Sequence, residues 1–178
     1  MAYVGMVVFL GSSSILFAAL FFMFAAFRVG HTDWPPNGLP RLPLWVPTLN
    51  TLVIGLSSGA LYRGGTWLRG GHPRPFRRLL TVAAGLGTLF ILLQAIYWLQ
   101  LWQAGFQIAT GLYSSYFYLL TVFHAIHATV GVVSLWWLLP ELQRPPHPRR
   151  AVRVKVTSMF WHFVGAMWIV TYLLVFLT

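Results

Sequence analysis

The sequence predicts an all-α integral membrane protein built as a bundle of five transmembrane helices. Hydrophobic residues make up 58% of the 178-residue chain, whereas soluble domains contain about 45–50%. Charged residues make up 8%, against about 25% in a soluble domain. A chain of this size cannot bury so much apolar surface in a water-facing core, because small domains leave much of their surface exposed. The composition therefore excludes a soluble enzyme, a disordered protein and a nucleic-acid partner.

Five apolar stretches are each long enough to cross a bilayer, since a hydrocarbon core of about 30 Å needs about 20 helical residues. None of them contains Lys, Arg, Asp or Glu. The intervening loops are rich in proline, which cannot continue a helix. We expect one membrane domain over residues 1–178, with spans at Val4–Phe27, Leu44–Tyr62, Leu79–Trp102, Tyr113–Leu139 and Val156–Leu177.

Individual stretches carry further signals. The first has no cationic segment before it and exceeds the apolar length of a signal peptide, so we expect a retained helix. In the second, Pro47 falls in the first helical turn, where its missing N–H costs nothing. The third and fourth are joined by an uncharged loop, and the proline-rich segment 144–148 ends the fourth before the last span begins.

Positive charges are concentrated in alternate loops. The loops after the second and fourth spans hold ten lysines and arginines, whereas the loop after the first span holds Arg28 and Arg41. Basic loops stay in the cytoplasm, which predicts a cytoplasmic N-terminus and an external C-terminus. Basic side chains at this face also attract anionic headgroups, and the candidates for such contacts are Arg74, Arg77, Arg78, Arg149 and Arg150.

Three histidines lie within the predicted spans, where polar groups are costly. The spacing of three places His124 and His127 on nearby positions of one helix face near mid-membrane, whereas His162 lies nearer the cytoplasmic surface. Neutral imidazole is a common metal ligand. Haem ligation by His127 and His162 would require both histidines to lie at the same depth in the membrane, which their positions along the spans disfavour. We interpret the imidazoles first as hydrogen-bonding groups between helices, with partner or lipid contact and metal binding as alternatives.

The other titratable and small residues narrow the function further. Asp33 and Glu141 lie in a loop and at a helix end, so no carboxylate lies at membrane depth to carry protons or bind Na⁺. This disfavours a self-contained pump or cation transporter. In the second span, Asn50 precedes a GxxxG pattern at Gly55 and Gly59, which allows close helix approach. We favour packing within the chain over a dimer face for these glycines.

The polar residues also follow a recognisable order. Trp34-Pro35-Pro36-Asn37-Gly38 precedes Pro47-Thr48-Leu49-Asn50-Thr51, and the later spans contain Phe123-His124-Ala125-Ile126-His127 and Phe160-Trp161-His162-Phe163-Val164. With these motifs the chain resembles subunit III of the haem–copper terminal oxidases, in its short form with five helices. The FHxxH and WHFV elements are the most specific.

The resemblance implies a redox-inactive accessory subunit beside the catalytic subunit I and the other oxidase subunits in a bacterial cytoplasmic membrane. Such a subunit binds phospholipid in its helix clefts and supports proton uptake and the durability of the active centre. Haem and copper are then expected in the partner subunit, with none bound by this chain. The residues expected to serve structure, partner contact or lipid contact are His124, His127, Trp161, His162, Asn50, Gly55 and Gly59.

The chain departs from the family at its acidic positions. Ser13 and Ile96 stand where the family commonly has membrane-buried glutamates, Gly165 replaces an aspartate, and Lys155 replaces a glutamate. These departures argue against a proton antenna built on carboxylates. Three alternatives stay open: a subunit-III-like protein of a nitric oxide reductase, a membrane cytochrome b anchor that uses the histidines, and a small transporter.

Overall fold

A computed structural model of the chain describes residues 2–30, 42–142 and 149–177, with the side chain of Arg149 outside that description. In this part the chain forms helices and no strand, which confirms the predicted all-α class. The elements are α1 (Ala2–Val29), α2 (Trp45–Arg69), α3 (Pro73–Gln103), the short 3₁₀ helix η2 (Ile108–Thr110), α4 (Leu112–Glu141) and α5 (Arg149–Phe176).

Four of these helices, α1, α3, α4 and α5, are long and apolar enough to cross a membrane. Helix α2 falls outside this group, because serine, threonine, asparagine and glycine interrupt its apolar residues and Arg63 lies in its second half. The chain is therefore a multi-pass helical membrane protein, and a fifth span through α2 stays a prediction.

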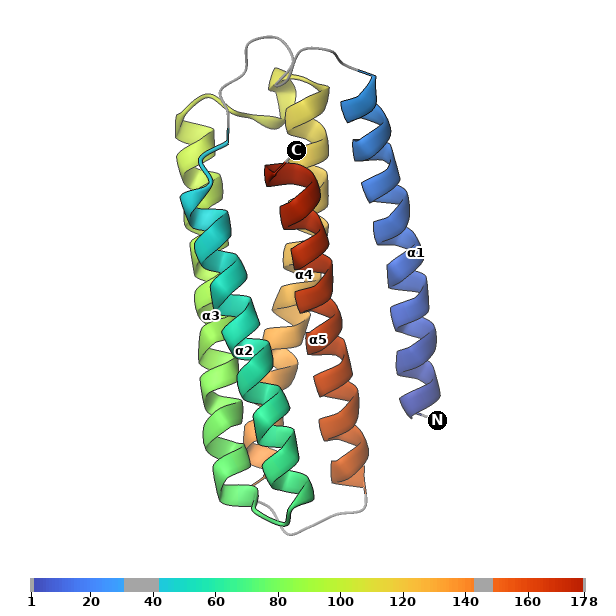
Figure 1. The fold of residues 1–178 in the computed structure, drawn as a ribbon, viewed down its shortest axis with the longest axis vertical. Helices are drawn as coiled ribbons and strands as arrows, with labels where there is room; N and C mark the ends of the chain where they lie inside the picture. Colours follow the sequence, from blue (N-terminus) through green and yellow to red (C-terminus); the bar gives the residue numbers. More distant parts are fainter. Residues whose placement is uncertain (1, 31–41, 143–148, 178) are drawn as a thin grey trace.

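The helices stand side by side in an elongated bundle (Figure 1). Helices α2 and α3 form an antiparallel pair, α5 packs against α2, α4 and α1, and α3 packs against α4. The N-terminus and the C-terminus lie toward opposite ends of the bundle (Figure 1).

Helix α1 lies at the edge of the bundle, where it packs against α4 and α5 (Figure 1). Aromatic side chains attach it. The fully buried Phe17 ring meets the rings of His127 and Phe163, at centroid distances of 5.2 Å and 6.3 Å. One end of the helix adds a contact in which Nζ of Lys155 lies 4.4 Å from the centre of the Tyr3 ring.

The helices extend beyond the predicted spans. Helix α2 continues past Tyr62 to Arg69, and α3 begins at Pro73 rather than Leu79. A tight turn joins them, and Gly71 in this turn adopts φ +80°, a value that glycine adopts without steric cost. The ends of the two helices pack closely, because a Cβ at Gly64 would lie 3.0 Å from a ring carbon of Phe76.

The inner face of α2 is set by helical periodicity. Its buried residues recur at intervals of three and four, and they are Val46, Pro47, Asn50, Val53, Ile54, Ser57, Leu61 and Gly64. Polar residues therefore face the interior of the bundle, where α3 and α5 surround them.

Candidate functional site

The centre of the described bundle is a junction built around Trp161 of α5. Its side chain is fully buried, and Nε1 donates a hydrogen bond to Oγ of Ser57 on α2 over 3.0 Å. Ser57 in turn donates to the carbonyl oxygen of Ala83 on α3 over 2.7 Å. Two glycines make room for the indole: a Cβ at Gly87 or Gly131 would lie 2.8 Å or 2.7 Å from carbons of its six-membered ring. The Trp161 junction thus joins α2, α3, α4 and α5.

A ladder of hydrogen bonds joins α2 and α5 next to this junction. Each rung pairs a hydroxyl group of α2 with a polar aromatic side chain of α5: Thr48 Oγ1 with the Tyr172 hydroxyl at 2.8 Å, Thr51 Oγ1 with Trp168 Nε1 at 3.0 Å, and Ser58 Oγ with His162 Nδ1 at 2.5 Å. From one rung to the next, the residue numbers rise on α2 and fall on α5, as expected for two antiparallel helices. Between them Gly165 faces Ile54, and a Cβ there would lie 4.0 Å from Cγ1 of Ile54.

His124 links α4 to α5. Its side chain is 1% exposed, and Nε2 donates a hydrogen bond over 2.9 Å to the carbonyl oxygen of Val164. The imidazole packs among aromatic rings, with the Trp168 centroid 5.2 Å away and the Phe90 centroid 5.7 Å away. Because Nε2 carries the donated proton, it has no lone pair for a metal.

His127 is half-buried and bonds within its own helix. Nδ1 donates over 2.8 Å to the carbonyl oxygen of Phe123. The ring contacts α1 through Phe9 and Phe17, at centroid distances of 6.2 Å and 5.2 Å, and contacts α5 through Phe160 at 6.4 Å. His127 therefore helps to attach α1 to the rest of the bundle.

The three imidazoles do not fit a shared haem or copper site. They bond to a carbonyl of α5, a carbonyl of α4 and a hydroxyl of α2, respectively. Bis-histidine haem requires two imidazole nitrogens that point at one iron. In the described residues, no three His, Cys, Asp or Glu side chains are arranged so that they could hold a metal ion.

Asn50 and Gln94 form a fully buried amide pair between α2 and α3. Nδ2 of Asn50 donates to Oε1 of Gln94 over 3.2 Å. The other two polar atoms of the pair, Oδ1 of Asn50 and Nε2 of Gln94, have no hydrogen-bond partner. Such groups are costly to bury, and this cost offsets part of the stabilisation from the hydrogen bond between Asn50 and Gln94.

The expected packing of Gly55 and Gly59 within the chain is wrong. Both residues are exposed, and a Cβ at either position would have no atom within 4 Å. The reason is helical phase: the face of α2 that turns inward carries Asn50, Ile54 and Ser57, and the GxxxG pattern lies on another face.

The positions that depart from the family's acidic pattern lie in different environments. Ser13 is 6% exposed on α1, and Gly165 is buried on α5. Ile96 is 47% exposed on the outer surface of α3, and Lys155 is exposed near the start of α5. Two of the four positions, Ser13 and Gly165, therefore lie inside the bundle, and the other two, Ile96 and Lys155, lie on its surface.

Basic residues gather at the end of the bundle that holds the N-terminus. Arg28 lies at the other end of α1, whereas this end carries Arg63, Arg69, Arg74, Arg77, Arg78, Arg149, Arg150, Arg153 and Lys155. Arg74, Arg77 and Arg78 are exposed there. Asp33, Asn37, Arg41 and Arg144 lie outside the described residues.

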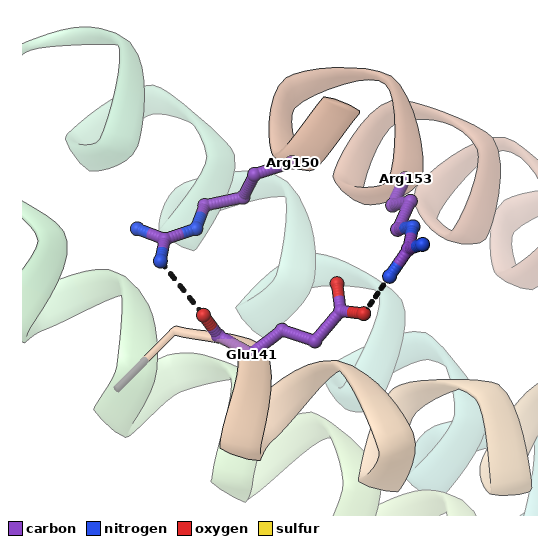
Figure 2. A network of polar contacts seen from close by, with 3 residues as sticks. All are labelled: Glu141, Arg150 and Arg153. Carbon is purple, nitrogen blue, oxygen red and sulfur yellow. Dashed lines mark hydrogen bonds and ion pairs between the residues drawn. The ribbon is translucent and has the colours of Figure 1, made fainter. Parts of the chain in front are cut away.

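Two arginines of α5 hold the last residue of α4 (Figure 2). Nη2 of Arg150 donates over 2.7 Å to the carbonyl oxygen of Glu141, and the guanidinium of Arg153 forms an ion pair with the Glu141 carboxylate. The first bond satisfies a carbonyl that a helix end leaves without a backbone partner. Sequence reasoning noted Arg150 only as a lipid contact and missed this clasp.

Sequence reasoning also missed how Ser57, Gly87, Gly131 and Trp161 meet. Trp161 is expected from the sequence to serve structure or contact, but its meeting with Gly87 and Gly131 depends on the pairing of separate helices. The one local signal was the combination of a polar aromatic residue on α5 with hydroxyl groups on α2 at matching intervals.

Comparison with known proteins identifies the family. The sequence model of cytochrome c oxidase subunit III matches residues 2–178. Cytochrome c oxidase subunit 3 of Thermostichus vulcanus is 30% identical over 97% of this chain and 85% of that protein. The Synechocystis protein of the same name is 31% identical over 97% of this chain and 74% of its own length. Cytochrome c oxidase subunit 3 of Pelomedusa subrufa is 32% identical over 97% of this chain and 67% of that protein. The chain therefore belongs to the cytochrome c oxidase subunit III family.

Proposed function

We propose that this chain is a non-catalytic accessory subunit of a respiratory haem–copper terminal oxidase, bound beside catalytic subunit I and the other oxidase subunits. The observation that carries the proposal is the family match over residues 2–178. The interior supports it, because the central imidazole, indole and hydroxyl groups are engaged in bonds between or within helices. Such groups stabilise a helical scaffold and are not poised for chemistry.

The proposed contribution to the oxidase is protection of the catalytic subunit and retention of lipid. The bundle offers exposed apolar side chains to a neighbouring membrane protein, and its basic end attracts anionic headgroups. On this proposal Arg74, Arg77, Arg78, Arg149 and Arg150 contact lipid, whereas His124, Trp161 and Asn50 hold the scaffold together. The outward face with Gly55 and Gly59 then suits close approach of a helix from the partner.

We place all five helices across a bacterial cytoplasmic membrane. Helix α2 has 25 residues, about 37 Å at 1.5 Å per residue, and it stands alongside the four apolar helices (Figure 1). The basic end then lies in the cytoplasm with the N-terminus, and the C-terminus lies outside.

The topology can be tested with single cysteines, since the chain has none of its own. Arg69→Cys lies at the basic end and Ala109→Cys lies between α3 and α4 at the opposite end. In intact cells, an impermeant thiol reagent should label position 109 and leave position 69 unlabelled until the cells are opened. Labelling of position 69 alone would reverse the orientation, and labelling of both positions would rule out the proposed arrangement of spans.

The partner can be tested by mild detergent extraction of the tagged chain from its native membrane. A haem–copper subunit with oxygen-reducing activity should co-purify with it, and the chain alone should show no Soret absorption. Recovery with a nitric-oxide-reducing complex would instead support the nitric oxide reductase alternative. A stoichiometric Soret band on the isolated chain would overturn the accessory role and support a cytochrome b anchor.

A further inference from the structure

The amide pair of Asn50 and Gln94 lies in the interior of the bundle, between α2 and α3. Asn50 is in the second turn of α2, toward the end of the bundle opposite the basic residues, and Gln94 faces it from α3 (Figure 1). The two residues are 0% and 2% exposed. Neither side chain reaches the surface of the described bundle, so its polar atoms depend on partners inside.

One hydrogen bond leaves half of this pair unsatisfied. Two amide groups that face each other can exchange two N–H···O bonds, because each carries a donor and an acceptor. Here Nδ2 of Asn50 donates to Oε1 of Gln94 over 3.2 Å, the long end of the usual range, and the reciprocal bond is missing. Oδ1 of Asn50 and Nε2 of Gln94 are the only buried side-chain nitrogen or oxygen atoms of the described residues without a partner. The pair therefore presents one free acceptor and one free donor.

The polar side chains of α2 that lie next to Asn50 in the sequence already have other partners. The hydroxyl groups of Thr48 and Thr51 donate to backbone carbonyl oxygens four residues earlier, over 2.7 Å and 2.8 Å. The same hydroxyl groups pair with Tyr172 and Trp168 of α5. None of these four side chains therefore supplies a bond to the free atoms of the amide pair.

We propose that an ordered water molecule binds between α2 and α3 and bridges Oδ1 of Asn50 and Nε2 of Gln94. Water both donates and accepts hydrogen bonds, and buried waters characteristically join polar groups that otherwise have no partner. Lipid offers no substitute, because hydrocarbon forms no hydrogen bonds. A cation would face the N–H group of Gln94 and an anion would face the carbonyl oxygen of Asn50, so the site favours a small neutral ligand.

Tyr97 connects this site with the nearby end of the bundle. It lies one turn beyond Gln94 on the inner face of α3, and its hydroxyl group donates over 3.2 Å to the carbonyl oxygen of Pro43, an exposed residue before α2. One turn from Gln94 in the other direction, the buried ring of Phe90 packs edge-on against Trp168, with 4.8 Å between the ring centroids. Polar groups thus lead from the site to the end of the bundle, and aromatic rings close it toward the middle.

The test places the full chain, with ¹⁵N-labelled glutamine and tryptophan, in phosphatidylcholine nanodiscs and measures magnetisation transfer from water to side-chain N–H groups by NMR. The amide of Gln94 should receive this transfer. The indole N–H of Trp161 should not, because it is equally buried but is bonded to Ser57. Gln103, exposed at the end of α3, is the positive control. The variant Gln94→Leu assigns the signal, which should disappear from its spectrum.

Asn50→Leu removes the acceptor but keeps a side chain of similar size, and it should abolish the transfer to Gln94. Thr51→Val is the matched control, because it changes the next residue of α2, whose hydroxyl group already has partners, and it should keep the transfer. No transfer to Gln94 in the wild-type chain, equal transfer to Gln94 and Trp161, or transfer that survives Asn50→Leu would each overturn the proposal. The comparison within the wild-type chain decides the matter if a variant fails to fold. Both amides belong to this chain, so failure to co-purify with an oxidase would count against the accessory role alone.

Discussion

Gly131→Ala is expected to destabilise the bundle, whereas Gly55→Ala is expected to leave its stability unchanged or slightly raised. The new methyl group at position 131 would lie 2.7 Å from Cε3 of Trp161, and the indole is fully buried and bonded to Ser57. Overpacking of this kind costs about 1–3 kcal/mol. A methyl group at position 55 would meet no atom within 4 Å, and alanine favours a helix over glycine.

The measurement is the thermal midpoint of the purified chain in one detergent, compared between these two variants. Trp161→Phe tests the mechanism, because a smaller ring relieves the contact with the added methyl group. The double variant of Gly131→Ala and Trp161→Phe should lose less stability than the two single losses added together. Equal midpoints for Gly131→Ala and Gly55→Ala, or strict additivity in the double variant, would contradict the tight packing at the Trp161 junction.

A terminal oxidase assembled without this chain is expected to keep its haem and copper spectra and its initial turnover, but to lose activity faster during sustained catalysis. The three central imidazoles of this chain are engaged in hydrogen bonds to separate partners, so removal of the chain takes no metal ligand away. In the proposed arrangement, removal also exposes the flank of the catalytic subunit to lipid and detergent. Oxygen consumption by matched preparations with and without the chain, followed over many turnovers, measures the effect.

Two outcomes would contradict the protective role. Identical decay curves would remove it, and immediate loss of all activity with intact metal spectra would indicate a direct part in catalysis. The source of protection can be examined in the assembled complex by neutralising Arg74, Arg77, Arg78, Arg149 and Arg150 together. If retained anionic lipid protects the active centre, this variant should reproduce part of the faster decay.

The helices could be predicted from the sequence because apolar length is a local property. Their ends are harder to predict: the second apolar stretch ends at Tyr62, which places Arg63 in a loop, but α2 continues to Arg69. Helix ends can leave the apolar layer, and Gly64 packs against Phe76 of α3 in that region. Long basic side chains can reach from a helix into the headgroup layer, so Arg63 does not mark the end of the helix.

For the site, the sequence predicts which residues matter but does not predict which helices they contact. The motif spacing identified Trp161, His124 and His162 as important, but the same spacing could not tell which helix each side chain meets. His124 and His127 share one helix face in the sequence, yet one bonds to α5 and the other to its own helix. Gly55 and Gly59 fit an interface motif perfectly and still lie on the outer face, because a motif of two glycines does not reveal which way the helix is turned.

The edge position of α1 has a consequence for how the protein is made. Helix α1 leaves the ribosome before the other four helices, but residues that hold it, such as His127 and Phe163, belong to α4 and α5, which are made after α2 and α3. Helices α2 and α3 can pair as soon as both are inserted, because a short turn joins them. Helix α1 therefore lacks its packing partners until α4 and α5 have been synthesised, and until then lipid or the insertion machinery must cover the face that they will bury.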